Sequence, residues 1–311
     1  MMPSTQLDLT QTVIHSLANT PDPRFKRVMT ALITKLHELM SEVDLTPEEW
    51  MAGLEFLAAT GKMCDERRQE FVLLSDTLGA SMLTVMLAQV RAGKLATGKP
   101  PTTTETTTTT ATTSATEATE ATVQGPFYWI GAPDKEFGAD IGKGVPGVPT
   151  YYSGKVVNTE GQPIAGALLD VWSGDGEGIY DMQYGEEAGM RARARFRTDA
   201  SGRYAFWSIR PNFYPIPMDG PVGRMFVAMA RNENRPGHIH FMLSAPGHLN
   251  VTTHIFVANS PYLDTDPVFG VRQSLVVEFK EHPPGKAPDG RVLNAPYWTS
   301  EFDFCLDRAA D

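Results

Sequence analysis

Four of the seven histidines in this sequence lie close together, at positions 238, 240, 248 and 254. His238 and His240 form a His-x-His unit inside a strand-like run, and alternate residues of a strand share one face. Two imidazoles on one face could hold a metal ion, or they could be two hydrogen-bonded core histidines, and the unit alone decides neither. His248 follows a Pro-Gly turn and His254 lies in the next strand-like run, so we expect surface or structural roles for both.

A metal ion bound by this pair would need further ligands. Cys64 and Cys305 lie far apart and form no Cys-x-x-Cys unit, which excludes a disulfide scaffold, a thiolate zinc site and an iron–sulfur cluster. Glu233 is the nearest carboxylate, and it falls in a loop where we expect it to be solvated. Tyr180 ends a glycine-rich loop and Tyr214 lies among prolines, although composition alone favours packed aromatic side chains at both positions.

The histidine pair belongs to a series of motifs along the chain. They are 125–128 (GPFY), 178–180 (GIY), 214–221 (YPIPMDGP), 235–240 (RPGHIH) and 244–247 (SAPG). Together they resemble the intradiol aromatic-ring dioxygenases, which are non-haem iron(III) enzymes that cleave catechols between the two hydroxylated carbons. The resemblance covers essentially the whole chain apart from a threonine-rich tract, and no ligand position is missing.

This resemblance implies a set of metal ligands and catalytic residues. Fe(3+) would be held by Tyr180, Tyr214, His238 and His240. By position, Tyr214 would dissociate when substrate binds and accept a substrate proton, and Arg235 would stabilise negative charge on the substrate. Phenolate is a hard anionic donor, and a bound cation lowers the phenol pKa far below its usual value. Oxygen and imidazole donors with an exchangeable position suit iron better than zinc or copper.

Within the family, the sequence is most similar to the hydroxyquinol (1,2,4-trihydroxybenzene) 1,2-dioxygenases. That subgroup implies a substrate wall made of Leu73, Asp76, Val123, Gly125, Phe127, Ile216, Pro217, Arg235 and Val268. Asp76 could accept a hydrogen bond from the third hydroxyl group, or it could cap a helix beginning at Thr77, and both can hold. The implied product is 3-hydroxy-cis,cis-muconate or maleylacetate. Cleavage of catechol or chlorocatechol is the alternative.

The elements that must position these residues begin with helices. Apolar residues recur at three- and four-residue spacing over 26–40, and the residues 46–49 (TPEE) form a capping box at the start of a second helix. The stretch 65–91 is too apolar for a lone surface helix, so we expect it to pack against other helices or a second subunit. Residues 1–100 are therefore predicted to be mostly helical, and the resemblance implies that they form a dimerisation and linker domain.

The rest of the chain contains a threonine-rich tract and then a region of short strand-like runs. Residues 101–122 are rich in threonine and carry almost no large apolar side chain, so we expect a mobile linker. Residues 123–311 should form a mostly antiparallel β-sandwich catalytic domain, which makes the whole chain an α+β protein. The runs expected to be strands are 152–157, 167–172, 203–209, 224–230, 238–245, 251–257, 274–279 and 301–306.

Composition narrows the choice of partners. A net charge of -10 argues against nucleic-acid binding, and no apolar run approaches the length of a membrane span. The N-terminus lacks the features of a secretory signal, so we expect a cytoplasmic enzyme that acts on a small aromatic diol or triol and O2. The resemblance further implies a homodimer that can enclose a lipid-like molecule between its helical parts.

Two other functions would fit parts of the sequence. A β-sandwich binding module that had lost catalysis should have lost at least one of the four implied ligands, and none is missing. A zinc hydrolase built on His238 and His240 would need an activating carboxylate, and none accompanies them. Both readings are therefore weaker than the dioxygenase.

Overall fold

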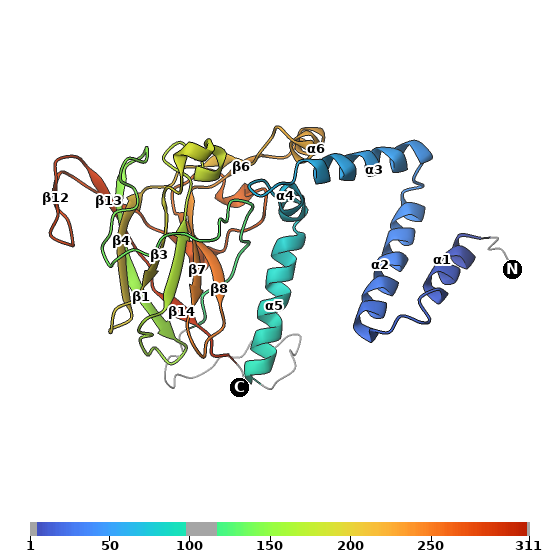
Figure 1. Ribbon diagram of the computed structural model, residues 1–311, viewed down its shortest axis with the longest axis horizontal. Coiled ribbons are helices and arrows are strands. Elements are labelled where there is room, and N and C mark those ends of the chain that lie inside the picture. Colours follow the sequence, from blue (N-terminus) through green and yellow to red (C-terminus); the bar gives the residue numbers. More distant parts are fainter. Residues whose placement is uncertain (1–4, 98–116, 310–311) are drawn as a thin grey trace. The chain divides into compact units, whose positions relative to one another are not determined.

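The computed structural model describes residues 5–97 and 117–309 (Figure 1). Its contacts divide the chain into two compact units, one that ends at Ala59 and one that begins at Thr60. Of the threonine-rich tract only residues 117–122 are described, so the expected linker over 101–116 lies outside the described residues. The predicted division at residues 100 and 122 stays a prediction.

The N-terminal unit consists of helices with well-formed N-caps. They are α1 (Gln6–His15), α2 (Pro23–Glu42) and most of α3 (Pro47–Lys62). The predicted capping box at the start of α3 is confirmed, because Thr46 Oγ1 accepts from the Glu49 N–H and the Glu49 carboxylate accepts from the Thr46 N–H. The apolar stripe of α2 is largely exposed in this chain.

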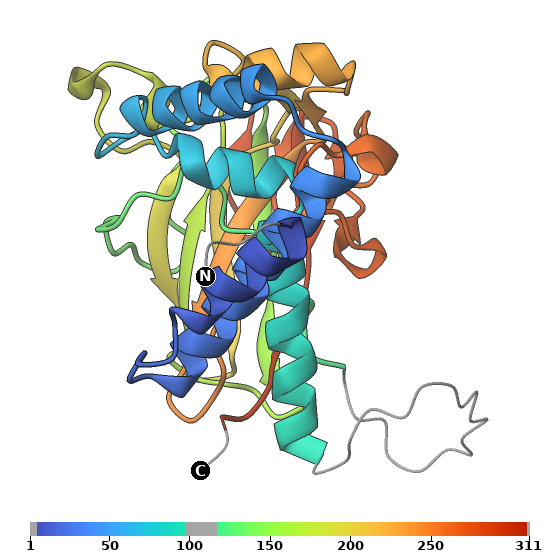
Figure 2. The ribbon, with the colours of Figure 1, turned by 90° about the vertical axis from the view of Figure 1, so that its right-hand side faces the viewer.

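The second unit begins with two further helices, α4 (Glu70–Thr77) and α5 (Ala80–Thr97). Gly79 joins them with a positive φ of 75°, a conformation that glycine adopts without strain. Leu73, Leu74 and Asp76 of α4 are buried, and α5 runs beside the β-sheets on the side of β8 (Figures 1 and 2). Among the described residues no single helix could span a membrane, and only the bent pair formed by α4 and α5 meets that test, by length and composition.

Two five-stranded sheets form the body of this unit. The first contains β10 (Lys280–His282), β13 (Tyr297–Glu301), β1 (Pro149–Asn158), β14 (Phe304–Leu306) and β4 (Arg203–Ile209), with β4 paired to β1. The second has the order β3 (Arg193–Arg197), β2 (Leu168–Trp172), β7 (His238–Ser244), β8 (Val251–Val257) and β9 (Val276–Val277). Within this second sheet all pairs are antiparallel except β8 with β9.

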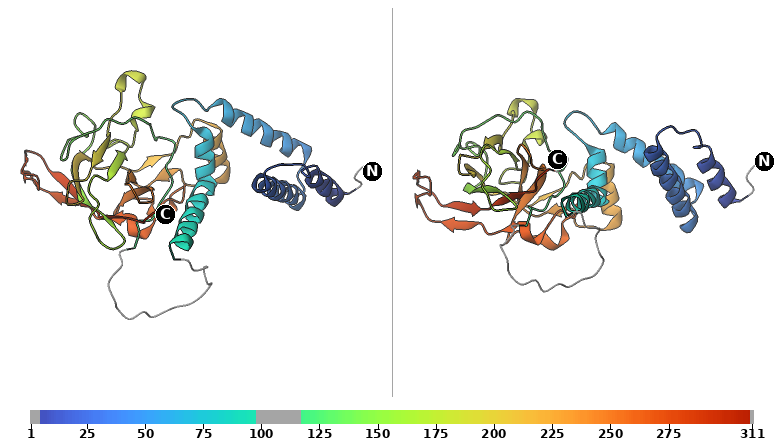
Figure 3. Two further views of the ribbon diagram at one scale, coloured as in Figure 1. Left: turned by 60° about the horizontal axis from the view of Figure 1, so that its bottom comes forward. Right: turned by 90° about the horizontal axis from the view of Figure 1, so that it is seen from below.

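The core lies between the two sheets. Phe206 and Phe304 from the first sheet pack in one buried cluster with Val171, Ile239 and Phe241 from the second. The predicted α+β class with a mostly antiparallel sandwich is confirmed. A short hairpin of β11 (Gly285–Lys286) and β12 (Val292–Leu293) extends from the side of the sandwich opposite α5 (Figure 3).

One expected strand is a helix. Residues 224–230 belong mostly to α6 (Pro221–Met229), not to a strand. Gly220 occupies the N-cap and Pro221 the first helical position, where its missing N–H costs nothing. Val222 and Phe226, one turn apart, are both fully buried. The apolar run is compatible with the two-residue period of a strand and with the 3.6-residue period of a helix. The proline at the first turn favours the helix.

The described end of the threonine-rich tract is attached to the sandwich. The Thr119 N–H donates to the Cys305 carbonyl, and the Cys305 N–H donates to Thr119 Oγ1. The Thr122 N–H donates to the Thr252 carbonyl of β8. Thr119 and Thr122 are buried. The chain therefore enters the β-sandwich in a fixed position beside β14 and β8.

Candidate metal centre

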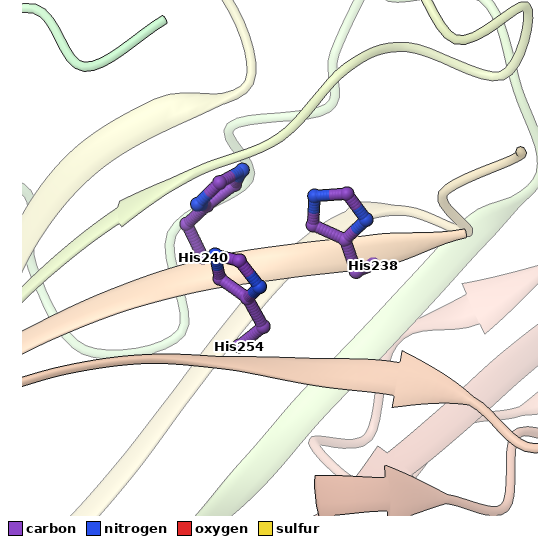
Figure 4. A group of neighbouring side chains, drawn as sticks. All are labelled: His238, His240 and His254. Carbon is purple, nitrogen blue, oxygen red and sulfur yellow. The ribbon is translucent and has the colours of Figure 1, made fainter. Parts of the chain in front are cut away.

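Three buried imidazoles meet on one face of the second sheet. His238 and His240 lie on β7 with their side chains on the same side, as predicted, and His240 is the direct cross-strand partner of His254 on β8 (Figure 4). The ring centroids of His240 and His254 are 4.1 Å apart, and those of His238 and His254 are 4.7 Å apart. One ring nitrogen from each lies within 4.8 Å of the others, a grouping that could hold a metal ion.

A surface or structural role was predicted for His254, and its place beside His240 in the buried cluster was not predicted. The position of the Pro246-Gly247 turn in the sequence does indicate this pairing. Gly247 lies midway between positions 240 and 254, so a hairpin folded at that turn places the two histidines opposite each other. His248, in contrast, lies on the turn itself, outside the cluster, with Nδ1 2.9 Å from the Pro246 carbonyl oxygen.

The two predicted tyrosines approach the same place. The phenol oxygen of Tyr180 lies 2.9 Å from His240 Nε2 and 3.4 Å from His238 Nε2. The Tyr214 ring lies 5.3 Å from the Tyr180 ring and 5.6 Å from the His238 ring, measured between centroids. The structure therefore brings together the four residues expected to be metal ligands.

A glycine makes this approach of the tyrosines possible. Gly178 has a φ of +83°, and a Cβ atom there would lie 2.5 Å from the Cβ of Tyr214. Tyr214 itself sits on the two-residue strand β5 (Tyr214–Pro215), which pairs with β6 (Asn234–Arg235). A side chain at position 178 would thus push apart the two segments that carry the tyrosines.

Hydrogen bonding determines which nitrogen of His238 is free. Nδ1 lies 2.7 Å from the Pro236 carbonyl oxygen, which can only accept, so Nδ1 carries the proton. Nε2 then keeps its lone pair and faces the Tyr180 phenol and the guanidinium of Arg235, whose Nη1 is 3.0 Å away. His238 is therefore a neutral imidazole prepared to bind a cation through Nε2.

Burial sets the charge state of the whole cluster. It lowers the pKa of His238, His240 and His254 well below the usual imidazole range, so all three are neutral at pH 7. It also raises the pKa of Tyr180 and Tyr214 above that of a free phenol. A bound cation would reverse the second effect, because its charge stabilises phenolate.

Several polar atoms of the cluster have no hydrogen-bond partner. Among the described residues, His240 Nδ1 and both ring nitrogens of His254 make no hydrogen bond of ordinary geometry. An unpartnered buried polar atom costs about 1–3 kcal/mol, so such atoms are uncommon without a reason. The neutral imidazoles and the Tyr180 phenol oxygen that faces Nε2 of His238 and His240 fit a bound cation.

Part of the expected substrate wall lines a cavity of about 690 Å³. Leu73, Phe127, Ile216 and Pro217 border it, and the Phe127 ring stacks on the Tyr180 ring at 4.5 Å. The other expected wall residues do not border this cavity. They are Asp76, Val123, Val268 and Arg235, which are all buried, and Gly125, whose Cβ position would lie 3.6 Å from His240 Cε1.

Two carboxylates lie near Arg235. Asp266 accepts from Arg235 Nε at 2.9 Å, and both side chains are buried. Asp76 is also buried, which raises its carboxyl pKa to about 6, although Ser81 and the Arg235 charge act in the opposite direction. Asp266 was not singled out from the sequence, since a lone aspartate in a loop carries no distinguishing pattern.

A second buried ion pair supports the aromatic side of the site. Asp181, next to Tyr180, pairs with Arg193 of β3, and Arg193 Nη2 donates to the Phe127 carbonyl at 3.0 Å. The Arg193 side chain thus links the segment that carries Tyr180 to the segment that carries Phe127. Sequence reasoning missed both members of this pair.

Comparison with known proteins identifies the family. Residues 123–307 match the family described as Dioxygenase, and residues 22–94 match the one described as Catechol dioxygenase N terminus. This chain belongs to the intradiol dioxygenases. The resemblance predicted from the sequence motifs is thereby confirmed, and with it the prediction of a dioxygenase enzyme.

Related dioxygenases are similar over almost their full length. The chain is 43% identical to the hydroxyquinol 1,2-dioxygenase of Nocardioides simplex, covering 96% of this chain and 94% of that protein. It is 42% identical to the 6-chlorohydroxyquinol 1,2-dioxygenase of Cupriavidus pinatubonensis, covering 97% of each. The crystal structure of a hydroxyquinol 1,2-dioxygenase from Pseudomonas putida matches this dioxygenase with a TM-score of 0.79 at 37% identity, over 98% of this chain and 99% of that one.

Proposed function

We propose that this dioxygenase cleaves hydroxyquinol between its adjacent hydroxylated carbons with O2, giving 3-hydroxy-cis,cis-muconate, a tautomer of maleylacetate. The observation that carries the proposal is Asp76, a carboxyl group buried about one helical turn from the cavity residue Leu73 on α4. A carboxylate there can accept a hydrogen bond from the third hydroxyl group, which catechol lacks. The relatives named for hydroxyquinol cleavage support the same substrate.

We propose that Tyr180, Tyr214, His238 and His240 hold iron(III). Hard phenolate oxygens and neutral imidazoles are donors that ferric iron accepts, and the Tyr180 phenol oxygen lies within 3.4 Å of Nε2 of both His238 and His240. When bound, iron would withdraw electron density from the catecholate so that the ring can react with O2. His254 lies beside this set as a further imidazole.

The side chains would then divide the work of proton and charge handling. Tyr214 would accept a proton from a substrate hydroxyl at its phenol oxygen, and the Arg235 charge near it favours the phenolate that must precede that step. Tyr180 would stay in place, because its ring is stacked on Phe127. Arg235 would stabilise negative charge on the ring and on the oxygens that form after cleavage.

Oxygen uptake tests the substrate directly. Purified protein would be assayed side by side with hydroxyquinol, catechol, 4-chlorocatechol and pyrogallol. We expect hydroxyquinol to give the highest kcat/KM and the ring-opened diacid as product. A clear preference for catechol would assign the protein to the alternative activity. The absence of oxygen uptake with all four substrates would contradict the proposed function.

Colour and metal content test the cofactor. Phenolate-to-iron(III) charge transfer should make the purified protein red to burgundy. We expect about one iron per chain, as four donors meet at one centre. A colourless protein that is fully active and filled with zinc would contradict the iron assignment.

We also propose a cytoplasmic homodimer joined through the helical residues 1–100. Leu32 and Leu36 of α2 and Leu83 and Leu87 of α5 are roughly half exposed in the single chain. Large apolar side chains repeated along a helix face usually cover a partner surface. Light scattering of the purified protein would give the mass of the assembly, and mass spectrometry after organic extraction would detect a lipid held at the interface.

A further inference from the structure

Asp266 has a distinctive position in the site. It follows the short helix η3 (Leu263–Thr265), and its carboxylate makes four separate contacts. Oδ1 accepts from Arg235 Nε at 2.9 Å and from the Val268 N–H at 3.4 Å. Oδ2 accepts from Arg235 Nη2 at 3.3 Å and from the Gly270 N–H at 2.9 Å. A carboxylate has about four acceptor positions, so all of its capacity is used.

These contacts tie two parts of the site to one group. The side chains of Arg235 and Asp266 are 3% and 2% exposed, so water does little to weaken their interaction. A long guanidinium side chain has many rotamers, and a two-pronged contact with a carboxylate selects one of them. In that rotamer Arg235 Nη1 points at His238 Nε2, 3.0 Å away.

The same carboxylate shapes the turn that carries Val268. Phe269 has a φ of +59°, a left-handed conformation that costs energy for a residue with a side chain. The Phe269 N–H donates to the Asp266 carbonyl oxygen. The Asp266 carboxylate accepts from the N–H groups of Val268 and Gly270, the two neighbours of Phe269. The turn is packed closely, since a Cβ atom on Gly270 would lie 3.2 Å from both Arg235 Nη2 and Asp266 Oδ2.

We propose that Asp266 is a positioning residue that orients the Arg235 guanidinium and holds the turn that carries Val268 in one fixed arrangement. Arg235 would act on the substrate, and Asp266 would act only through Arg235 and through the turn. This inference rests on the proposed function for its effect on catalysis. The geometry of Arg235 in an Asp266 variant does not depend on that function.

Asp266→Asn is the variant that tests the proposal. The amide keeps the shape of the carboxyl group but replaces an acceptor oxygen by an NH2 donor, which would face an N–H of Arg235 or of the turn. We expect kcat for hydroxyquinol to fall roughly 10- to 100-fold with a rise in KM, while iron content and the visible band of the substrate-free enzyme stay close to wild type. Asp266→Glu keeps the charge and displaces the carboxylate within a closely packed turn, so it should show the same changes in kcat and KM.

Asp199 offers a control with the same kinds of donor at a more exposed position. Its carboxylate accepts from Arg203 Nε at 2.9 Å and from the backbone N–H groups of Ser201 and Arg203, the same kind of contact on a turn outside the site. Asp199→Asn should leave kcat and KM unchanged. A drop in kcat equal to that of Asp266→Asn would show a general effect of losing such a contact and would overturn the proposal.

A double-mutant cycle separates positioning from general stability. If the main effect of Asp266 on kcat runs through Arg235, the double variant Asp266→Asn with Arg235→Gln should lie within about threefold of Arg235→Gln alone, and the remaining difference reports the contribution of the turn. Fully additive losses in kcat, or a loss of activity explained by lost iron, would overturn it. A crystal structure of Asp266→Asn should show Arg235 Nη1 moved away from His238 and the turn at 266–270 rearranged. An unmoved Arg235 would refute the proposal even if the wild-type protein had no dioxygenase activity.

Discussion

His240 of β7 and His254 of β8 are direct cross-strand partners, and their ring planes lie at 77° to each other with centroids 4.1 Å apart. The edge of one imidazole therefore faces the other, and His254 adds a third ring to a pair that the sequence motif already contains. Three imidazoles without a carboxylate suit zinc and other divalent ions of intermediate softness. The site can thus be expected to take up such ions in competition with iron.

His254→Gln should lower the affinity for zinc by roughly 10-fold or more, because one potential nitrogen ligand is lost. Zinc titration of the metal-free protein in the presence of a chromophoric chelator measures this. His248→Gln is the control, since His248 lies on the turn outside the cluster. Equal zinc affinities for wild type and His254→Gln would show that the third ring does not reach the ion.

Tyr180→Phe should abolish the red colour or shift its band strongly, and lower activity by at least roughly 100-fold. The phenol oxygen lost lies 2.9 Å from His240 Nε2, at the centre of the proposed ligand set. Tyr204→Phe is the matched control: Tyr204 is equally buried, and its hydroxyl donates only to the Phe302 carbonyl, so its loss should cost about 1 kcal/mol of stability and no iron. Iron analysis and visible spectra decide between the two, and a fully active, coloured Tyr180→Phe would rule out the ligand.

Asp76→Ala should reduce the preference for hydroxyquinol over catechol by roughly 10- to 100-fold in the ratio of kcat/KM values, which corresponds to losing one hydrogen bond to a charged group. The catechol activity should change much less, because catechol has no hydroxyl for Asp76 to contact. Parallel oxygen-uptake assays of both substrates give the ratio. An unchanged ratio of kcat/KM for hydroxyquinol to that for catechol would mean that Asp76 does not contact the third hydroxyl group.

The pH dependence of stability should also report on Asp76. Burial raises its pKa from about 3.9 in the unfolded chain to about 6 in the folded one, so between these values the folded state binds more protons. The contribution of Asp76 to the free energy of unfolding is therefore greatest below pH 4. It falls by about 3 kcal/mol as the pH rises to 6. Asp76→Asn should remove this loss, which denaturant unfolding at pH 5 and pH 7 would show as a smaller difference than in wild type.

The sequence was informative where a short pattern carries its own geometry. The His-x-His unit predicted two imidazoles on one face of β7, and the capping box at Thr46 predicted the start of α3; both are confirmed. The prediction of a strand at 224–230 is wrong because the apolar spacing there fits a strand or a helix, and Pro221 at the first helical position favours the helix. Local pattern alone could not separate the two periods.

The supporting residues could not be found in this way. Asp266 and Arg235 are 31 positions apart, and Asp181 and Arg193 are 12 apart, across loops whose path no local pattern dictates. Their roles arise from burial and from the pairing of distant segments, which only the folded chain displays. His254 is intermediate, since the Gly247 turn would have predicted its pairing with His240 had the hairpin register been considered.

The four proposed ligands come from three separate segments: the loop that ends at Tyr180, the short strand of Tyr214, and the N-terminal end of β7 with His238 and His240. An ion held by all of them would act as a crosslink between parts of the chain that no disulfide joins. Its binding free energy would then be folding free energy for the loops around the site. Iron binding and the ordering of those loops should therefore be coupled in one equilibrium, so that the protein with iron bound has more rigid loops than the iron-free protein.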